Sequence, residues 1–207
     1  MEAISTKMET KAKLLDMKAS IGALIDESIE VKKSLHSISE DITKLSLLCI
    51  NAIRNGNKIL ICGNGGSAAD AQHFATELVV KYKHDRKSIP CIALTTDSSV
   101  LTAIINDYSG EEVYAKQVEG LGTSGDILIG ISTSGKALNV RKAFEEAKEL
   151  GIKTVALTGA GSKGQDFAAL ADLALIVPSS VTSRIQECHI TILHILAELI
   201  DRELFLA

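Results

Sequence analysis

Short apolar runs recur along the chain from residue 58 onward, and segments with helical spacing of apolar residues separate them. Each run is bounded by Gly, Pro, Asp or Ser, and this pattern predicts strands at 58–62, 91–95, 126–131, 153–158 and 171–177. The segments between the runs predict helices at 66–81, 111–120, 137–150 and 182–205. Strands that are apolar throughout and alternate with helices indicate a parallel sheet covered on both faces. The predicted fold class is therefore α/β, with a doubly wound parallel sheet.

The first 55 residues differ from the rest because they contain no strand-like run. Their apolar residues recur at helical spacing, and Gly22 is their only glycine. This pattern predicts two helices with a break near residues 18–25. The chain thus divides into an N-terminal helical arm at 1–55 and one compact α/β domain at 56–207.

Composition and charge narrow the classes of partner. The net charge of −4 gives no support to a nucleic-acid partner, although backbone amides at a helix start can still bind an anionic substrate. The N-terminus has no apolar signal core, and no apolar stretch approaches membrane-spanning length. None of the cysteines forms a Cys-x-x-Cys pair, which predicts free thiols in a reducing compartment at Cys49, Cys62, Cys91 and Cys188. We expect a cytoplasmic protein without membrane or nucleic-acid partners.

Two loops rich in glycine and hydroxyl residues follow predicted strands. The sequence GNGGS at 63–67 follows the first strand, and STSG at 132–135 follows the third. Either loop alone could be a tight turn or a helix cap. Because both lie at the carboxyl ends of neighbouring strands and precede helices, together they favour a phosphate site. The first loop is neither Gly-x-Gly-x-x-Gly nor a P-loop with its Lys, which argues against a nucleotide.

Histidine and carboxylate side chains form a second candidate site. His73 and Glu77 are four residues apart, so they share one helix face and could hold a metal ion. The same spacing also suits a solvated His–Glu pair without a metal. The last helix carries His189 and His194 among Ile and Leu residues, where a histidine is more often satisfied by a hydrogen bond than bound to metal. That expectation applies well to His189.

Four segments together resemble the sugar isomerase (SIS) family. They are ICGNGGSAADAQHFATEL, TTDSSVLTAIIND, GISTSG and RIQECHITILH, and they occur in matching order and spacing over roughly residues 25–205. Within the family they are similar to the members that isomerise D-sedoheptulose 7-phosphate. The resemblance implies a flavodoxin-like sheet of five strands (the SIS domain) and a homotetramer.

The resemblance also implies functional residues. It implies one zinc ion per active site, held by His73, Glu77, Gln186 and His194. Together with the two loops, it gives as expected substrate contacts Asn64, Gly65, Gly66, Ser67, Glu77, Asn106, Asp107, Ser132, Thr133, Ser134 and Gln186. It assigns acid–base catalysis to Glu77 and His194.

The implied reaction is an aldose–ketose isomerisation. Sedoheptulose 7-phosphate would become D-glycero-D-manno-heptose 7-phosphate, for ADP- or GDP-activated heptose and then lipopolysaccharide or another surface glycan. Glu77 would move a proton between C1 and C2 through a cis-enediol, and His194 would shuttle a proton between the two oxygens. Zinc would polarise the carbonyl, and the 132–134 loop would hold the phosphate.

Helix geometry adds an expectation about assembly. Gln186 and His194 are eight residues apart, so their Cα atoms would be about 12 Å apart along a straight helix. Their side chains could barely meet at one ion. We therefore predict that each zinc takes them from different subunits, with active sites at subunit interfaces, or that the helix is distorted between them.

Three positions depart from the best-known family members. Ala137 stands where a last phosphate-loop Ser is frequent, Lys81 where an Arg is found, and Ser183 where an Asp can occur. The three departures affect the fine substrate preference, and Ala137 keeps open an isomerase of another ketose phosphate. Two further functions compete with catalysis, namely a non-enzymatic relative that associates with the replication initiator and a sugar-phosphate sensor. The initiator-associating relatives lack the Glu at position 77 and the distal His, and sensor modules accompany a further domain for which the chain has no room.

Overall fold

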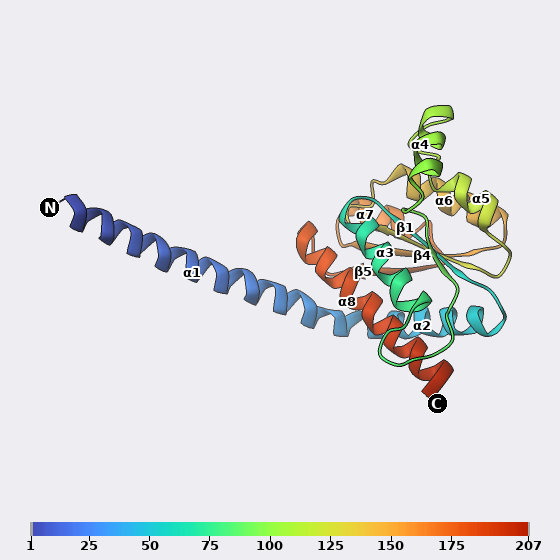
Figure 1. Cartoon of the computed structure of the whole chain (residues 1–207), viewed down its shortest axis with the longest axis horizontal. Coiled ribbons are helices and arrows are strands. Elements are labelled where there is room, and N and C mark those ends of the chain that lie inside the picture. Colours follow the sequence, from blue (N-terminus) through green and yellow to red (C-terminus); the bar gives the residue numbers. More distant parts are fainter. Residues whose placement is uncertain (1, 207) are drawn as a thin grey trace.

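Five parallel strands form one sheet at the centre of the protein (Figure 1). The computed structural model describes the backbone of residues 2–206 and the side chains of residues 13–206. The strand order is β2-β1-β3-β4-β5, which is the flavodoxin-like order and confirms the predicted fold class. The strands are β1 (Ile59–Gly63), β2 (Cys91–Ala93), β3 (Ile127–Ser132), β4 (Lys153–Gly159) and β5 (Leu173–Val177).

Helices cover both faces of the sheet because successive strand residues point to opposite sides. Ile59 and Ile61 of β1 belong to one buried cluster, and Leu60 and Cys62 belong to the other. The first cluster includes buried residues of α2 (Ser39–Arg54), α3 (Gly66–Val79) and α8 (Thr182–Asp201). The second includes those of α4 (Ser98–Asp107), α5 (Ala115–Leu121), α6 (Leu138–Glu149) and α7 (Ser162–Ala168).

Most predicted elements are present, with ends shifted by one or a few residues. The helices predicted at 66–81, 111–120, 137–150 and 182–205 correspond to α3, α5, α6 and α8, and a π-helical turn at Arg202–Leu206 follows α8. Neither α4 nor α7 was predicted. Helix α4 is mostly exposed, and its start is set by the Asp97 carboxylate, which accepts from the amides of Ser99 and Val100 at 3.0 Å.

The N-terminal arm is one long helix, α1 (Glu2–Ser34), which projects away from the sheet (Figure 1). The predicted break near residues 18–25 is therefore wrong. Gly22 is exposed, and a single glycine lowers the stability of a helix by about 1 kcal/mol without ending it. The interruption comes later, at a 3₁₀ turn over Leu35–Ile38 that joins α1 to α2.

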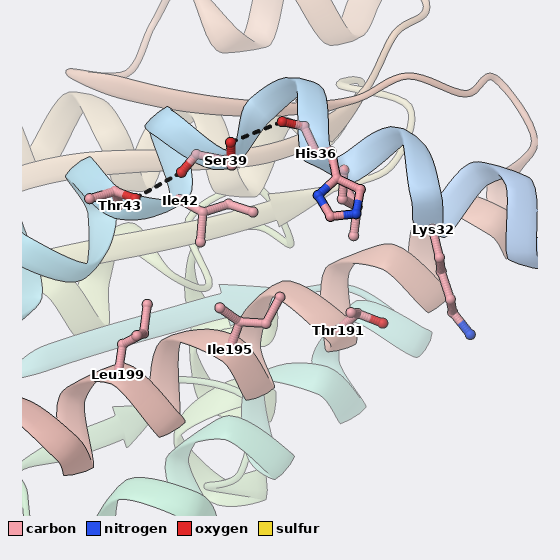
Figure 2. A pocket seen from close by; sticks show the side chains of 9 residues that line it. Lys32, His36, Ser39, Ile42, Thr43, Thr191, Ile195 and Leu199 are labelled. Carbon is pink, nitrogen blue, oxygen red and sulfur yellow. Dashed lines mark hydrogen bonds between the residues drawn. The ribbon is translucent and has the colours of Figure 1, made fainter.

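Serine hydroxyls accompany this 3₁₀ turn. Ser34 donates to the carbonyl of Val31 at 2.6 Å, and Ser37 donates to that of Ser34 at 2.7 Å. Figure 2 shows the next such bond, from Ser39 to the carbonyl of His36 at 2.9 Å. Such bonds compete with the helical ladder and bend it. The serine-rich composition of this stretch, not the glycine, marks the end of α1.

An apolar seam runs along α1 with alternating spacings of three and four residues, and we call it the heptad seam. Its outer part is half exposed or more, with Leu14 at 62%, Met17 at 53%, Ile21 at 56% and Leu24 at 54%. The same spacing continues inward through Ser28, Val31, Leu35, Ile38, Ile42 and Leu45, which become increasingly buried. The single chain therefore covers only the inner part of the seam.

All four cysteines are buried and free, as predicted for the thiols themselves. Burial raises the pKa of the Cys49 and Cys62 thiols well above its ordinary range, so neither is a reactive thiolate. Within the described residues, no helix combines the length and apolar character that crossing a membrane requires.

We expect Asp172→Asn to lower the free energy of unfolding at neutral pH by about 1–2 kcal/mol. This figure allows for solvent screening of the interaction, because a third of the Asp172 side chain is exposed. Burial alone would raise the pKa of Asp172, but the Thr154 amide, the Lys153 ammonium and the Thr154 hydroxyl outweigh it and lower the pKa to about 2. A depressed pKa contributes stability above the ordinary value of 3.8, and this contribution is lost as the pH falls toward 2. Urea unfolding across this pH range should show wild type and variant converging at the acid end, and a difference that stays constant would contradict the assignment.

Candidate active site

A cavity of about 310 Å³ opens at the carboxyl edge of the sheet between β1 and β3. The chain leaves β1 toward one edge of the sheet and leaves β3 toward the other, so this is the switch point at which open parallel sheets bind ligands. Residues of both predicted loops line it, together with one residue of α8: Asn64, Ser67, Ile131, Ser132, Thr133, Ser134, Lys136, Ala137 and Gln186. The structure thus brings most of the predicted phosphate-site residues together.

Glycines shape the first loop. Gly65 has a φ of +56°, a conformation that side chains rarely adopt, and it precedes the first turn of α3. A Cβ on Gly66 would lie 2.7 Å from Nε2 of Gln186, so the absence of a side chain lets Gln186 lie against the helix start. Of the predicted contacts here, Ser67 is buried and lines the cavity.

Asn64 is held by two residues that the sequence analysis did not single out. Its amide exchanges two hydrogen bonds with the amide of Asn139, both 2.9 Å long. The buried Tyr114 hydroxyl donates to the Gly63 carbonyl at 2.5 Å and lies 3.3 Å from Oδ1 of Asn64. These contacts fix the Asn64 side chain and leave one of its N–H groups for a ligand. They also join the β1 loop to α6 across the cavity.

The hydroxyl loop after β3 supplies the other wall. Ser132 is buried and its carbonyl accepts from the Thr158 hydroxyl at 2.8 Å, while Ser134 is exposed. Among the described residues that line the cavity, none is acidic and Lys136 is the only one with a charge. Such a lining of hydroxyls, amides and one ammonium suits an anion.

Three side chains from two helices form a cluster beyond this cavity. Nε2 of His73 lies 3.0 Å from Oε1 of Glu77 and 3.2 Å from Nε2 of His194. One potential ligand atom of each residue lies within 4.8 Å of the others. Two imidazoles and a carboxylate are ligands that zinc prefers, so this donor set fits the implied metal. A solvated His–Glu pair does not account for His194, which joins the pair from a helix 121 residues away in sequence.

Tyr82 and Asp70 flank the cluster. The Tyr82 ring lies over that of His194 with centroids 5.9 Å apart and planes at 30°. Burial raises the pKa of the Asp70 carboxyl to about 6, against the opposing effect of His73, and Oδ2 of Asp70 is buried without a hydrogen-bond partner. Neither residue was predicted for the site, because neither belongs to a spacing or motif that indicates a ligand.

Helix α8 carries functional side chains at two separate levels. It is a continuous α-helix over Thr182–Asp201, so the distortion considered for this helix is absent. Gln186 lies beside Gly66 at the cavity, whereas His194 lies beside His73. Helices α3 and α8 thus run in the same direction, and the seven residues from Gly66 to His73 place the cavity and the cluster about 10 Å apart.

Two further places on the chain carry residues considered for the site, namely His189 and the end of α4. His189 is buried, its Nε2 lies 3.4 Å from the Thr158 carbonyl, and burial lowers its pKa to about 4. His189 thus has a hydrogen-bond partner, as predicted, and it does not belong to the cluster of His73, Glu77 and His194. Asn106 and Asp107 lie at the end of α4, where the Asn106 amide donates to the Asp107 carboxylate at 2.7 Å. Neither residue is among those that line the cavity within the described chain.

The parallel sheet, the anion cavity at its switch point and the adjoining histidine–carboxylate cluster define an SIS-domain protein. The SIS domain model matches residues 25–159. A phosphoheptose isomerase of Helicobacter pylori (strain P12) is 56% identical over 172 residues, covering 83% of this chain and 88% of the relative. One from Sulfurimonas denitrificans is 50% identical over 192 residues, covering 91% and 97%.

Solved structures agree with these relatives. The phosphoheptose isomerase structure from Neisseria gonorrhoeae has a TM-score of 0.83 at 43% identity and covers 89% of this chain and 98% of that one. The one from Francisella tularensis has a TM-score of 0.84 at 38% identity and covers 88% and 97%. The chain belongs to the phosphoheptose isomerase family of SIS-domain proteins.

Proposed function

We propose that the protein is an aldose–ketose isomerase that converts D-sedoheptulose 7-phosphate into D-glycero-D-manno-heptose 7-phosphate. The observation that carries this proposal is a distance of about 10 Å, along the parallel helices α3 and α8, between the anion cavity and the His–Glu–His cluster. This separation is comparable to the span from the reacting carbons to the phosphate of an extended seven-carbon sugar. The phosphate would lie at Ser132–Ser134 and the reacting carbons at His73 and Glu77.

Glu77 is the proposed base of the reaction. Its carboxylate is largely buried, with 20% of the side chain exposed, and one oxygen contacts His73. Its second oxygen is the one we assign to the substrate. It removes the proton from C1 and delivers it to C2, while His194 transfers a proton between the two substrate oxygens. The cavity at the other end of the substrate fixes its position along α3.

His73, Glu77 and His194 are the residues we assign to a zinc ion, with Gln186 as a further ligand. When bound, zinc supplies a Lewis acid that polarises the substrate carbonyl. The chain's own geometry limits how Gln186 can take part. It lies at the level of Gly66, about 12 Å along α8 from His194, so we assign the Gln186 ligand to a neighbouring subunit.

A homotetramer is the assembly we propose, and the heptad seam supports it. Beside the seam, Leu15, Ile25 and Ile29 are also exposed, which makes the apolar face of α1 wider than a two-stranded seam requires. A groove of about 370 Å³ between the α1–α2 junction and α8 continues this face, with Ile195 and Leu199 on its α8 side (Figure 2). We assign helices of further copies of this chain to these surfaces.

The competing functions are less well supported. Glu77 and His194, which the initiator-associating relatives lack, are present and in contact with His73. An isomerase of another ketose phosphate remains a second candidate, because Ala137 leaves the cavity without one hydroxyl of the related loops. We place the enzyme in the cytoplasm, where its product would enter nucleotide-activated heptose synthesis for a surface glycan.

A direct assay tests the proposed function. We expect purified protein to convert sedoheptulose 7-phosphate to the heptose 7-phosphate, to lose this activity with a strong chelator, and to regain it with added zinc. A pentulose or hexulose phosphate at the same concentration is the control for the second candidate. Turnover of the shorter substrates alone would contradict the heptose assignment, and full activity after chelation with verified metal loss would remove zinc from the reaction.

A further inference from the structure

The loop that follows β3 carries a charged residue which no motif of the chain accounts for. Lys136 is exposed and lines the anion cavity next to Ser134 and Ala137. Its ammonium forms no ion pair or hydrogen bond within the described residues. Lys142, Lys153 and Lys163 nearby in sequence pair with carboxylates, and Lys148, which also forms no ion pair within the described residues, does not line the cavity. Among the residues that the structure describes, Lys136 thus presents an uncompensated positive charge at a cavity with no acidic lining residue.

The backbone beneath Lys136 is held in place on two sides. Gly135 has a φ of +69°, and a Cβ there would lie 2.0 Å from the carbonyl oxygen of Lys163, so only glycine allows this close approach to α7. The Arg141 guanidinium donates to the Gly135 carbonyl from Nε at 3.1 Å and from Nη2 at 2.9 Å. Because both contacts fix the residue before Lys136, its side chain starts from a defined position at the cavity rim.

Ala137 completes this arrangement. It occupies the N-cap position of α6, where no side chain accepts from the first free amides of the helix. A serine at this position would supply a hydroxyl, whereas alanine leaves the amides uncapped and adds no bulk to the cavity. Compared with a loop that has serine at position 137, this loop lacks one neutral hydroxyl. It instead offers the uncapped amides of α6 and the ammonium of Lys136, one residue earlier.

We infer that Lys136 binds the phosphate of the substrate and makes the cavity selective for the doubly charged phosphate ester. This inference rests on the proposed function for the identity of the sugar, but not for the binding of phosphate itself. The ammonium compensates one of the two phosphate charges, and hydroxyls and amides provide the remaining donors. Because a lysine is a flexible point charge, it contributes to affinity more than to orientation.

Replacement of Lys136 by methionine tests this role. We expect Lys136→Met to raise the KM for the sugar phosphate and the Kd for inorganic phosphate by about tenfold or more, with kcat within about threefold of wild type. Lys136→Arg should restore most of the affinity. Lys148→Met, at an exposed position in the last turn of α6, the helix that follows Lys136, is the matched control and should leave both constants unchanged. Calorimetry with inorganic phosphate gives a readout that does not depend on turnover.

The outcomes separate this inference from the proposed function. If Lys136→Met loses phosphate affinity while the wild type fails to isomerise sedoheptulose 7-phosphate, the role of Lys136 in phosphate binding is supported and the proposed reaction is refuted. If the wild type isomerises the heptulose and Lys136→Met keeps its KM and its phosphate Kd, the role of Lys136 is overturned. A wild-type KM that rises with ionic strength much more steeply than that of Lys136→Met would further support the charge interaction.

Discussion

Replacing Glu77 by Gln is expected to reduce kcat by about 10³- to 10⁴-fold, with a much smaller change in KM. Glutamine keeps the shape of the side chain and its contact with His73, but it cannot remove a proton from carbon. Phosphate binding in the cavity about 10 Å away does not involve this carboxylate, so substrate affinity should persist. Incubation with substrate in D₂O provides a second measurement, because the variant should also stop exchanging the proton at C1.

Metal content must be measured in the same variant, since we assign Glu77 both as a zinc ligand and as the base that moves the proton. A neutral amide is a weaker ligand, and assays at saturating zinc separate the loss of metal from the loss of the base. Glu198→Gln is the matched control, because Glu198 is a carboxylate of α8 that pairs with Lys83. Wild-type turnover or wild-type C1 exchange by Glu77→Gln would show that another group moves the proton.

The strands were predictable because a strand that is buried on both faces appears in the sequence as a short continuous run of apolar residues. Each of β1 and β3 is buried along its whole length, and each appears in the sequence as an unbroken apolar run. Helices α4 and α7 lack such a signature, since they are short and their boundaries depend on local caps and turns. The end of α1 was misplaced because serine side-chain bonds, not glycine flexibility, accompany the 3₁₀ turn.

The candidate site was predictable only in part, for a different reason. His73 and Glu77 share a helix face, so their spacing alone places them together, whereas His194 comes from a helix that only the tertiary fold brings near. Asn139 and Lys136 belong to no motif, and their roles emerge only when the loops after β1 and β3 meet at the cavity. The resemblance to a family supplied the ligand set, but not the separation of Gln186 from His194 into two levels.

Mixing two inactive variants is expected to restore activity, and this result would establish that each site is shared between subunits. Gln186→Ala and His194→Ala should each be nearly inactive alone, because each removes a residue assigned to the metal site. In a symmetric pair of subunits, a mixed pair carries both lesions in one site and none in the other. Unselected random pairing after co-expression should therefore return about a quarter of wild-type turnover, and mixed pairs selected through two different tags should return about half.

The geometry of the cluster supplies the matched control for this experiment. Glu77 and His194 both contact His73 within one chain, so one subunit supplies both residues to a given site. A mixed pair of these two variants has one lesion in each site, and no activity should return. If the Gln186→Ala and His194→Ala mixture also stays inactive while the tetramer forms, Gln186 acts in the same subunit as His194. Its role would then be confined to the phosphate cavity that it lines beside Gly66, because about 12 Å of continuous α8 keeps it from the ion at His194.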